Sequence, residues 1–334
     1  MSVSDNIFLC PKCRKNLAVF KCTGCGYEVP QINSIYQFCE DPPVKISGEN
    51  QYIGYDGIGE DFEPQVIFWD ANNIERYGVY EACGDQIARK FGRNITVLDL
   101  GAGLGTASIP LAKNGIHTIT ADISNVMLST GVKRAKGRYS NLIFARMNAY
   151  EIMLADSSVD IIIENAVLHL VSNPESVIKE MVRVLKPGGC LIRYSTYGQP
   201  VSEEEAKQNQ YCNSVLEDIS SKYFDYLKEH GYKSIWFDNH FEDIIKNYFK
   251  PPCRDIVENF SEVFTEKMKF RLHRLKTGAH SDLQDTPRGL INAAWQYTDS
   301  YAVKKYGPGY MEIKGFSRYG AAIDIYELNG SKAQ

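Results

Sequence analysis

The sequence predicts an α/β protein whose mostly parallel sheet is covered by helices on both faces. Between residues 75 and 238, short apolar runs alternate with amphipathic segments of helical length, and a last strand-like run covers residues 321–328. The hydrophobic fraction of 44% and the charged fraction of 23% are those of an ordinary globular chain. Apolar strands that alternate with helices build parallel sheets buried on both faces, and this is the fold class that we expect.

The expected elements follow one another in a regular order. Strands are expected at residues 95–100, 116–121, 142–146, 159–164 and 190–196. Helices are expected at residues 75–91, 105–114, 124–136, 174–185 and 203–229. A strand-like run at residues 233–237 closes this part of the chain. We therefore expect one domain that consists of residues 75–238 together with the last strand, in residues 316–330.

The segment 239–315 interrupts this alternation. Its pattern is mainly helical around residues 241–249, 255–275 and 288–305, and it contains many aromatic side chains. Helical periodicity without alternating strands predicts a helical insertion before the last strand of the sheet.

Two Cys-x-x-Cys pairs stand near the N-terminus: Cys10, Cys13, Cys22 and Cys25. Each pair makes a tight turn whose thiolates can share one metal ion, and two such turns supply a tetrahedral set of four sulfurs. The eight residues between the pairs are enough for one hairpin, which we place at residues 17–20. Residues 1–40 are therefore predicted to form a zinc-ribbon knuckle with a structural Zn²⁺, and iron or a redox-active dithiol are the alternatives.

Residues 41–74 are expected to be a linker and an irregular arm. Asp41-Pro42-Pro43 breaks any regular element. The stretch that follows is rich in glycine, acidic and aromatic residues. We expect its aromatic side chains to anchor the arm on the neighbouring domain.

The charge balance and the lack of long apolar stretches limit the function classes. Lys plus Arg number 37 and Asp plus Glu number 41, which gives a formal net charge of −4. Proteins that grip a nucleic-acid backbone usually carry a basic surplus. No apolar stretch approaches the length that spans a bilayer, and the first residues lack the features of a signal peptide. We therefore expect a cytoplasmic protein without a membrane partner.

The centre of the functional prediction is a glycine-rich turn, Asp99-Leu100-Gly101-Ala102-Gly103-Leu104-Gly105, between an expected strand and an expected helix. Glycines permit a sharp turn and let a ligand approach the backbone. Asp122, at the end of the next strand, is placed to accept hydrogen bonds from two ribose hydroxyls. These two features alone do not separate S-adenosylmethionine (SAM) from a dinucleotide, although Thr106 replaces the third glycine of the dinucleotide fingerprint.

Three downstream motifs distinguish between these ligands. Residues 146–149 follow the third strand, residues 158–163 form the fourth, and residues 184–189 make the Pro-Gly-Gly turn before the fifth. In this order and spacing, the set closely resembles the class I SAM-dependent methyltransferases, over roughly residues 75–238 and the last strand. The resemblance implies a Rossmann-like sheet of seven strands with the last one antiparallel, which suits residues 319–328.

The resemblance also implies roles for individual residues. The glycine turn would contact the methionine part of SAM, with Asp99 supporting its amino end, and Asp122 would hold the ribose. Ile123 would lie against the adenine, and Asn148, where many members have Asp, would face the adenine amino group. The residues expected to bind the cofactor are Asp99, Gly101, Gly103, Gly105, Asp122, Ile123, Asn148, Ala149, Glu164 and Asn165.

Each of these assignments has a purely structural alternative. The glycines would then form only a tight turn, and Asp122 would be a helix N-cap. Asn148 and Glu164 would satisfy backbone groups.

Residues on the acceptor side are harder to assign. His169 follows the fourth strand, where many family members place a residue near the methyl acceptor, and it is the candidate general base; core packing is its alternative role. The aromatic candidates for a substrate pocket, each also a candidate for core packing, are Tyr52, Tyr55, Trp69, Tyr194, Tyr197, Trp236 and Trp295. A basic run either binds an anionic substrate or RNA or forms a solvated helix face, and it consists of Lys267, Lys269, Arg271, Arg274 and Lys276.

Three functions remain open at this point. Methylation of a small molecule fits the acidic balance, the absence of an Asn-Pro-Pro-Tyr or Asp-Pro-Pro-Tyr motif, and the insertion 239–315, since such insertions form substrate lids in small-molecule members. Methylation of rRNA or tRNA fits the knuckle with its basic residues, because a family of rRNA guanine methyltransferases carries a four-ligand zinc finger before the same fold. A non-catalytic protein that docks a partner through the knuckle is the third function, and the intact glycine and acidic motifs argue against it.

Overall fold

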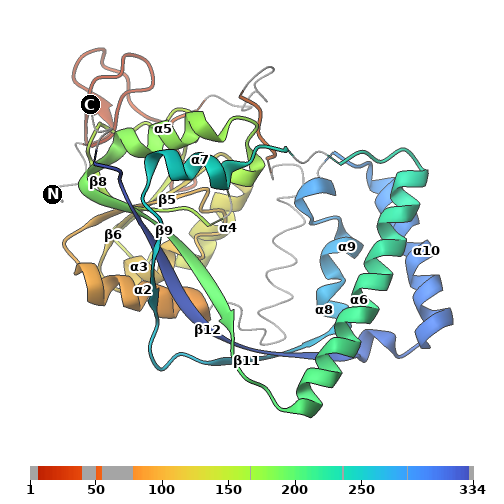
Figure 1. Cartoon of the computed structure of the whole chain (residues 1–334). Coiled ribbons are helices and arrows are strands. Elements are labelled where there is room, and N and C mark those ends of the chain that lie inside the picture. Colours follow the sequence, from red (N-terminus) through yellow and green to blue (C-terminus); the bar gives the residue numbers. More distant parts are fainter. Residues whose placement is uncertain are drawn as a thin grey trace.

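The structure is a computed structural model that describes residues 7–39, 50–54, 78–165, 167–234, 237–283 and 285–330. Figure 1 shows a sheet covered by helices and, beside it, a smaller lobe of helices. Two long strands, β9 (Leu185–Gly198) and β12 (Lys314–Glu327), run from the sheet toward this lobe. The chain is thus divided into a sheet domain and a helical lobe that share two strands.

The central sheet has the predicted, mostly parallel order. Its parallel strands, in the order in which they lie side by side, are β7 (Leu142–Arg146), β6 (His117–Asp122), β5 (Thr96–Leu100), β8 (Val159–Ile163) and β9. β12 follows β9 and runs antiparallel to it, which confirms the expectation for the last strand. Because β5 pairs with β6 on one side and β8 on the other, the strand order reverses there, and such reversals open a crevice at the carboxyl ends of the strands.

The strand expected at residues 233–237 is not formed by the described residues of that run. Its place beside β12 is taken by β10 (Cys253–Ile256), which pairs with residues 322–325 in the antiparallel sense. The chain therefore continues for about the length of one more helix before it forms the strand at the sheet edge. The periodicity of the short run at residues 233–237 could not show this.

The prediction of a helix at residues 255–275 is wrong for the first half of this range. β11 (Glu262–Lys267) instead pairs with residues 314–319 of β12, and helical structure begins only at α8 (Met268–Arg271) and continues in α9 (His273–Thr277). Pairing with a neighbouring strand decides the conformation here, because strand preference depends strongly on the available partners.

Helices cover both faces of the sheet. Successive side chains of a strand point to opposite faces, so each strand packs against both layers of helices. The helices of the sheet domain are α2 (Gly78–Phe91), α3 (Ser108–Lys113), α4 (Asn125–Ala135), α5 (Pro174–Val184) and α7 (Phe241–Tyr248). Val97 and Ile161 pack under α2 and α3, whereas Leu98 and Ile162 pack with α5 and α7 on the other face. α7 was expected in the insertion, yet it contacts α5.

The helical lobe contains α6 (Glu203–Glu229), α8, α9 and α10 (Arg288–Tyr306) around a core of its own. The bounds of α6 agree with the prediction because Ser202 and Glu205 form a reciprocal capping box at its start. Its position differs from the prediction, since α6 packs against α10 in the core of the lobe and, in the sheet, against β12. None of the described helices is long and apolar enough to cross a bilayer.

The N-terminal knuckle is continuous with the sheet. The expected hairpin consists of β1 (Leu17–Ala18) and β2 (Lys21–Cys22). A second hairpin, β3 (Gln31–Ile32) and β4 (Ile35–Gln37), adds to the sheet edge because β4 pairs with β7 in parallel. Residues 7–39 therefore do not form a separate unit, whereas the expected linker at 41–74 lies outside the described residues except for residues 50–54.

Candidate functional site

A cavity lies at the carboxyl edge of the sheet, where the strand order reverses. It is lined by residues from the ends of β5, β6 and β7, from the segment after β8, and from residues 52–54. The sequence-predicted residues in its wall are Gly101, Gly103, Asp122, Ile123, Asn148, Ala149 and His169. Seven of the eleven predicted cofactor and catalytic residues are thus brought to one cavity.

The glycine turn forms one wall, and its backbone conformation requires glycine. Gly101, Gly103 and Gly105 have φ angles of +67°, +52° and +67°, a region that side chains other than glycine rarely adopt. A Cβ atom on Gly101 would lie 1.8 Å from Cγ2 of Val167. Gly105 does not line the cavity but lies beneath the turn, near Ile109.

The carboxylate of Asp122 is held in the cavity wall by two backbone donors. Gly103 N donates to Oδ2 at 2.8 Å, and Ser124 N donates to Oδ1 at 2.8 Å. The N-cap of α4 is Ser124, whose side chain accepts from Met127 N, so Asp122 does not serve as that cap. Each carboxylate oxygen can accept more than one hydrogen bond, so these two backbone bonds do not by themselves exhaust the acceptor capacity of Asp122.

Asp99 lies behind the turn and does not line the cavity. It is 4% exposed, and Ser108 Oγ donates to its Oδ2 at 2.5 Å. Burial raises the pKa of Asp99 to about 7, and the charge of Asp122 acts in the same direction, while the bond from Ser108 opposes it. Any contribution of Asp99 to ligand binding is therefore indirect.

Two predicted cofactor residues, Glu164 and Asn165, are not in this wall. Glu164 is fully buried, and its Oε1 accepts from the backbone N–H groups of Val167 and Leu168 at 2.7 and 3.2 Å. Its Oε2 lies 3.0 Å from Arg193 Nε. Asn165 Oδ1 accepts from Tyr194 N at 2.7 Å. Glu164 therefore shapes the segment after β8 from beneath, which is the structural alternative considered for it.

His169 is half-buried in the cavity wall, near the start of the segment after β8. Burial lowers the pKa of His169, and the nearby Arg193 acts in the same direction, while Glu164 opposes both. Its imidazole is therefore neutral near pH 7, which is the state that a general base requires.

A second cavity of about 420 Å³ lies between the sheet domain and the helical lobe. Asn165 and Tyr194 line it from the sheet, and Glu266 and Arg271 line it from β11 and α8. Glu266 is 4% exposed, and its Oε2 lies 3.4 Å from Arg271 Nε. This cavity adjoins the end of β8 and combines aromatic walls with one buried ion pair.

The predicted aromatic and basic residues are divided among several places. Tyr52 lines the first cavity and Tyr194 the second, whereas Tyr197 packs over Gly320 and Trp295 packs in the lobe. Tyr55, Trp69 and Trp236 lie outside the described residues. In the basic run, Lys267 and Lys269 pair with Glu312, so the run is not a free cationic face.

Sequence reasoning missed several wall residues of the first cavity. They are Ile53, Gly54, Met127, Met147, Tyr150, Val167, Leu170 and Val171. The segment at residues 52–54 reaches the wall because Ile53 N donates to Leu170 O at 2.8 Å. No motif in the sequence indicates that contact, since it joins segments far apart in the chain.

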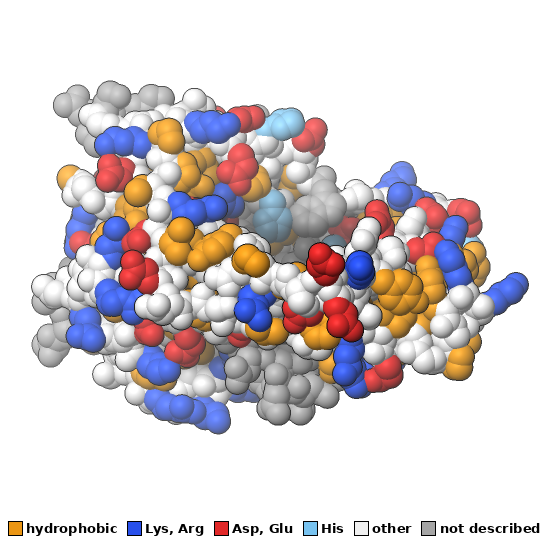
Figure 2. Space-filling model, turned by 60° about the horizontal axis from the view of Figure 1, so that its bottom comes forward, with side chains coloured by type: hydrophobic (Ala, Val, Ile, Leu, Met, Phe, Trp, Pro, Cys, Tyr) orange, Lys and Arg blue, Asp and Glu red, His pale blue; other side chains and the backbone are white. Residues whose placement is uncertain are grey.

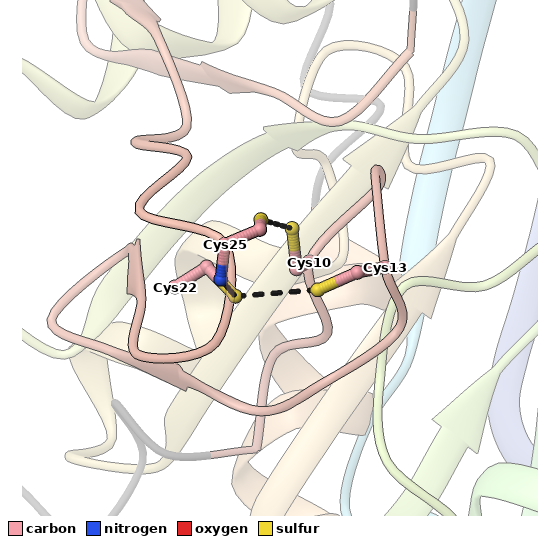
Figure 3. Close-up of side chains that lie close together, drawn as sticks. All are labelled: Cys10, Cys13, Cys22 and Cys25. Atoms are coloured by element: carbon pink, nitrogen blue, oxygen red, sulfur yellow. Dashed lines mark hydrogen bonds between the residues drawn. The ribbon is translucent and has the colours of Figure 1, made fainter.

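The four predicted metal ligands come together in the knuckle (Figure 3). Their Sγ atoms all lie within 4.8 Å of one another, with 3.6 Å between Cys10 and Cys25 and 3.4 Å between Cys13 and Cys22. The backbone N–H groups of Cys25 and Gly24 donate to Cys22 Sγ at 3.4 and 3.3 Å. A close set of four sulfurs fits a tetrahedral metal ion.

Comparison with known proteins agrees with this geometry. Residues 98–193 match the family model described as "Methyltransferase domain". This part of the chain is therefore similar to methyltransferase domains.

Curated relatives of this domain act on different substrates. A demethylmenaquinone methyltransferase from Clavibacter sepedonicus is 31% identical over 139 residues, which cover 40% of this chain and 56% of the relative. A tRNA 5-carboxymethoxyuridine methyltransferase from Escherichia coli (strain K12) is 28% identical over 149 residues, 43% of this chain and 57% of the relative. The chain thus spans little more than half the length of these relatives.

Among solved structures, a Haemonchus contortus phosphoethanolamine N-methyltransferase in complex with S-adenosyl-L-methionine is 16% identical. The match covers 74% of this chain and 52% of that protein, with a TM-score of 0.35.

We predict that Gly101→Ala destabilises the domain, because the new methyl group meets Val167 in a backbone conformation that alanine avoids. The expected loss in the free energy of unfolding is about 2–4 kcal/mol, from overpacking and left-handed strain together. Gly137→Ala is the matched control, since Gly137 has a φ of +63° with no atom within 4 Å of an added Cβ. Denaturant unfolding should show the smaller loss there, and equal losses would contradict the steric account.

Proposed function

We propose that this protein transfers the methyl group of SAM to a small-molecule acceptor. The observation that carries the proposal is the cavity in which the glycine turn, Asp122 and the wall after β7 meet at the carboxyl edge of the sheet. This cavity lies mainly within the methyltransferase domain, residues 98–193. Relatives named as a demethylmenaquinone methyltransferase and as a tRNA 5-carboxymethoxyuridine methyltransferase support the reaction class.

The residues of the first cavity have the chemistry that a nucleoside with an amino-acid tail requires. Asp122 would accept hydrogen bonds from the ribose hydroxyls, and Ile123 would pack against the base. The backbone of Gly101 and Gly103 would approach the methionine part. When bound, SAM supplies an electrophilic methyl group on a positively charged sulfur, so the protein mainly orients the acceptor and excludes water.

The second cavity supports a small acceptor. Its volume of about 420 Å³ is in the usual range for sites that bind small molecules. It adjoins Asn165 at the end of β8, and its polar side chains, including Ser195 and Ser317, can orient an acceptor by hydrogen bonds. This space between the sheet and the lobe is therefore a candidate for the acceptor, in addition to the part of the first cavity that His169 lines.

The surface gives less support to an RNA acceptor. In the knuckle, Arg14 pairs with Glu151 and Lys21 with Glu28. On the face shown in Figure 2, Lys and Arg are interspersed with Asp and Glu. Binding to a phosphate backbone depends on accumulated positive charge, which the net charge of −4 does not favour.

We further propose that the knuckle holds one structural Zn²⁺ through Cys10, Cys13, Cys22 and Cys25. Four thiolates complete a tetrahedral shell and leave no open position for catalysis. Cys10 and Cys22 are buried in the same apolar cluster as the sheet, so the metal would stabilise the domain as well as the knuckle.

Asp122→Ala should weaken SAM binding at least about tenfold, because a hydrogen bond to a charged group contributes roughly 1.5–3 kcal/mol. Calorimetric titration with SAM measures the change, and Asp225→Ala, at an exposed acid on α6, is the control for the lost charge. Unchanged affinity would contradict the ribose assignment. A wild-type protein that is folded but does not bind SAM would instead favour a non-catalytic binding protein.

His169→Gln should lower the rate of methyl transfer by about 100-fold if the imidazole removes a proton from the acceptor. Because the pKa of His169 lies below its usual value, the wild-type rate should be constant at neutral pH. It should fall as the pH drops through that lowered pKa, where the ring becomes protonated. The measurement is S-adenosylhomocysteine formation against pH with acceptors from a metabolite panel, with bulk tRNA as the competing substrate. If His169 only packs against its neighbours, the rate of the variant should fall at low pH in the same way as the wild-type rate.

Elemental analysis should find about one zinc per chain. Cys25→Ser should lose the metal, whereas Cys253→Ser, which also replaces an exposed cysteine, should retain it. A metal-free wild-type protein would rule out the structural zinc.

A further inference from the structure

Arg146 lies between the knuckle and the first cavity, at the end of β7. It is 1% exposed, and its Nε donates to Ile123 O at 3.0 Å. The next residue, Met147, donates from its N–H to Asp122 O at 2.9 Å. The buried arginine therefore helps to join the ends of β6 and β7, and the residues that follow both ends form the cavity wall.

The knuckle holds Arg146 from the opposite side. β4 pairs with β7 so that Gln37 lies opposite Arg146, and Phe38 N donates to Arg146 O at 3.0 Å. Gln37 Nε2 also donates to Asn125 Oδ1 at 3.1 Å, at the start of α4. Backbone and side-chain bonds thus connect β4 with the two segments that flank Asp122 and Ile123.

Stacked aromatic rings connect β4 with the cysteine pairs. The ring of Phe20 lies 3.5 Å from that of Tyr36 and 5.1 Å from that of Phe8, and Phe8 lies 5.3 Å from Phe38 (centroid distances). Phe8 and Phe20 each precede a cysteine of the cluster by two residues. Their positions therefore depend on the geometry in which the four sulfurs are held.

A second connection reaches the loop after β7. Leu9 N donates to Met153 O at 2.9 Å, and Ala155 N donates to Ile7 O at 2.7 Å. Arg14 Nη1 lies 3.4 Å from Glu151 Oε1. The same loop begins with residues 147–150, which line the cavity.

We propose that the metal-closed knuckle positions the adenosine side of the SAM site, and that Arg146 is the positioning residue through which it acts. This inference rests on the proposed function. Closing the four thiolates around a metal fixes the aromatic stack and β4, and these hold Arg146 and the loop after β7. SAM affinity should therefore depend on the metal, although the cysteines contribute nothing to the cavity wall.

The test is calorimetric titration of the full-length, zinc-loaded protein with SAM and with adenosine, before and after chelation. We expect both ligands to bind at least about tenfold more weakly without zinc, with the far-ultraviolet circular dichroism retained and the affinity restored by added zinc. Adenosine reports on the proposed wall because it lacks the methionine part. Equal affinities with and without zinc would overturn the inference.

Two variants keep the test decisive if chelation unfolds the chain. Arg146→Lys, which keeps the charge but loses the bond from Nε, should weaken both ligands about tenfold at unchanged zinc content. Arg14→Ala, at a half-exposed contact, should weaken them by about threefold, and Cys253→Ser should change nothing. Wild-type affinity in both arginine variants would overturn the inference. Failure of the zinc-loaded wild type to bind SAM would instead refute the proposed function.

Discussion

The close passage of the segment after β8 over the glycine turn is the constraint on which the site depends. A side chain on Gly101 would overlap Val167, so only glycine lets the two backbones approach. Because they approach, the turn after β5 and the segment after β8 both contribute to the wall of one cavity. Glu164 stabilises this arrangement from beneath by accepting hydrogen bonds from Val167 and Leu168. The glycine turn thus contributes backbone to the wall, apolar side chains such as Met127 and Met147 contribute most of the rest, and Asp122 adds a carboxylate.

The knuckle and the sheet form one structure. β4 extends the sheet beside β7, and the aromatic rings of the knuckle share an apolar cluster with Met147 and Met153. A small cysteine-rich module has little core of its own, so packing against the sheet supplies the burial that it lacks. In return, an edge strand that would otherwise be open is covered.

The sequence was sufficient for the central sheet and for the glycine turn and Asp122 of the cavity wall. The parallel strands β5 to β9 and the bounds of the helix α6 could be placed because their patterns are local, and the glycines and Asp122 lie directly at strand ends. Glu164 turns away from the wall toward the nearby backbone of residues 167 and 168. Other features escaped because they depend on contacts between distant segments. β11 forms because β12 offers a partner, and residues 52–54 reach the cavity through Leu170. Sequence periodicity carries no information on such contacts.

The long strand β12 has a mechanical consequence for the second cavity. It is paired along its whole length, first with β11 over residues 314–319 and then with β9 over residues 319–327. The helical lobe is therefore connected to the sheet domain by a continuous hydrogen-bonded β-ladder and not by a single flexible hinge. Displacing the lobe requires the ladder to bend or twist, which distributes the deformation over many residues. Discrimination among acceptors should then depend on the shape that the second cavity has before an acceptor binds, because the cavity is rigid.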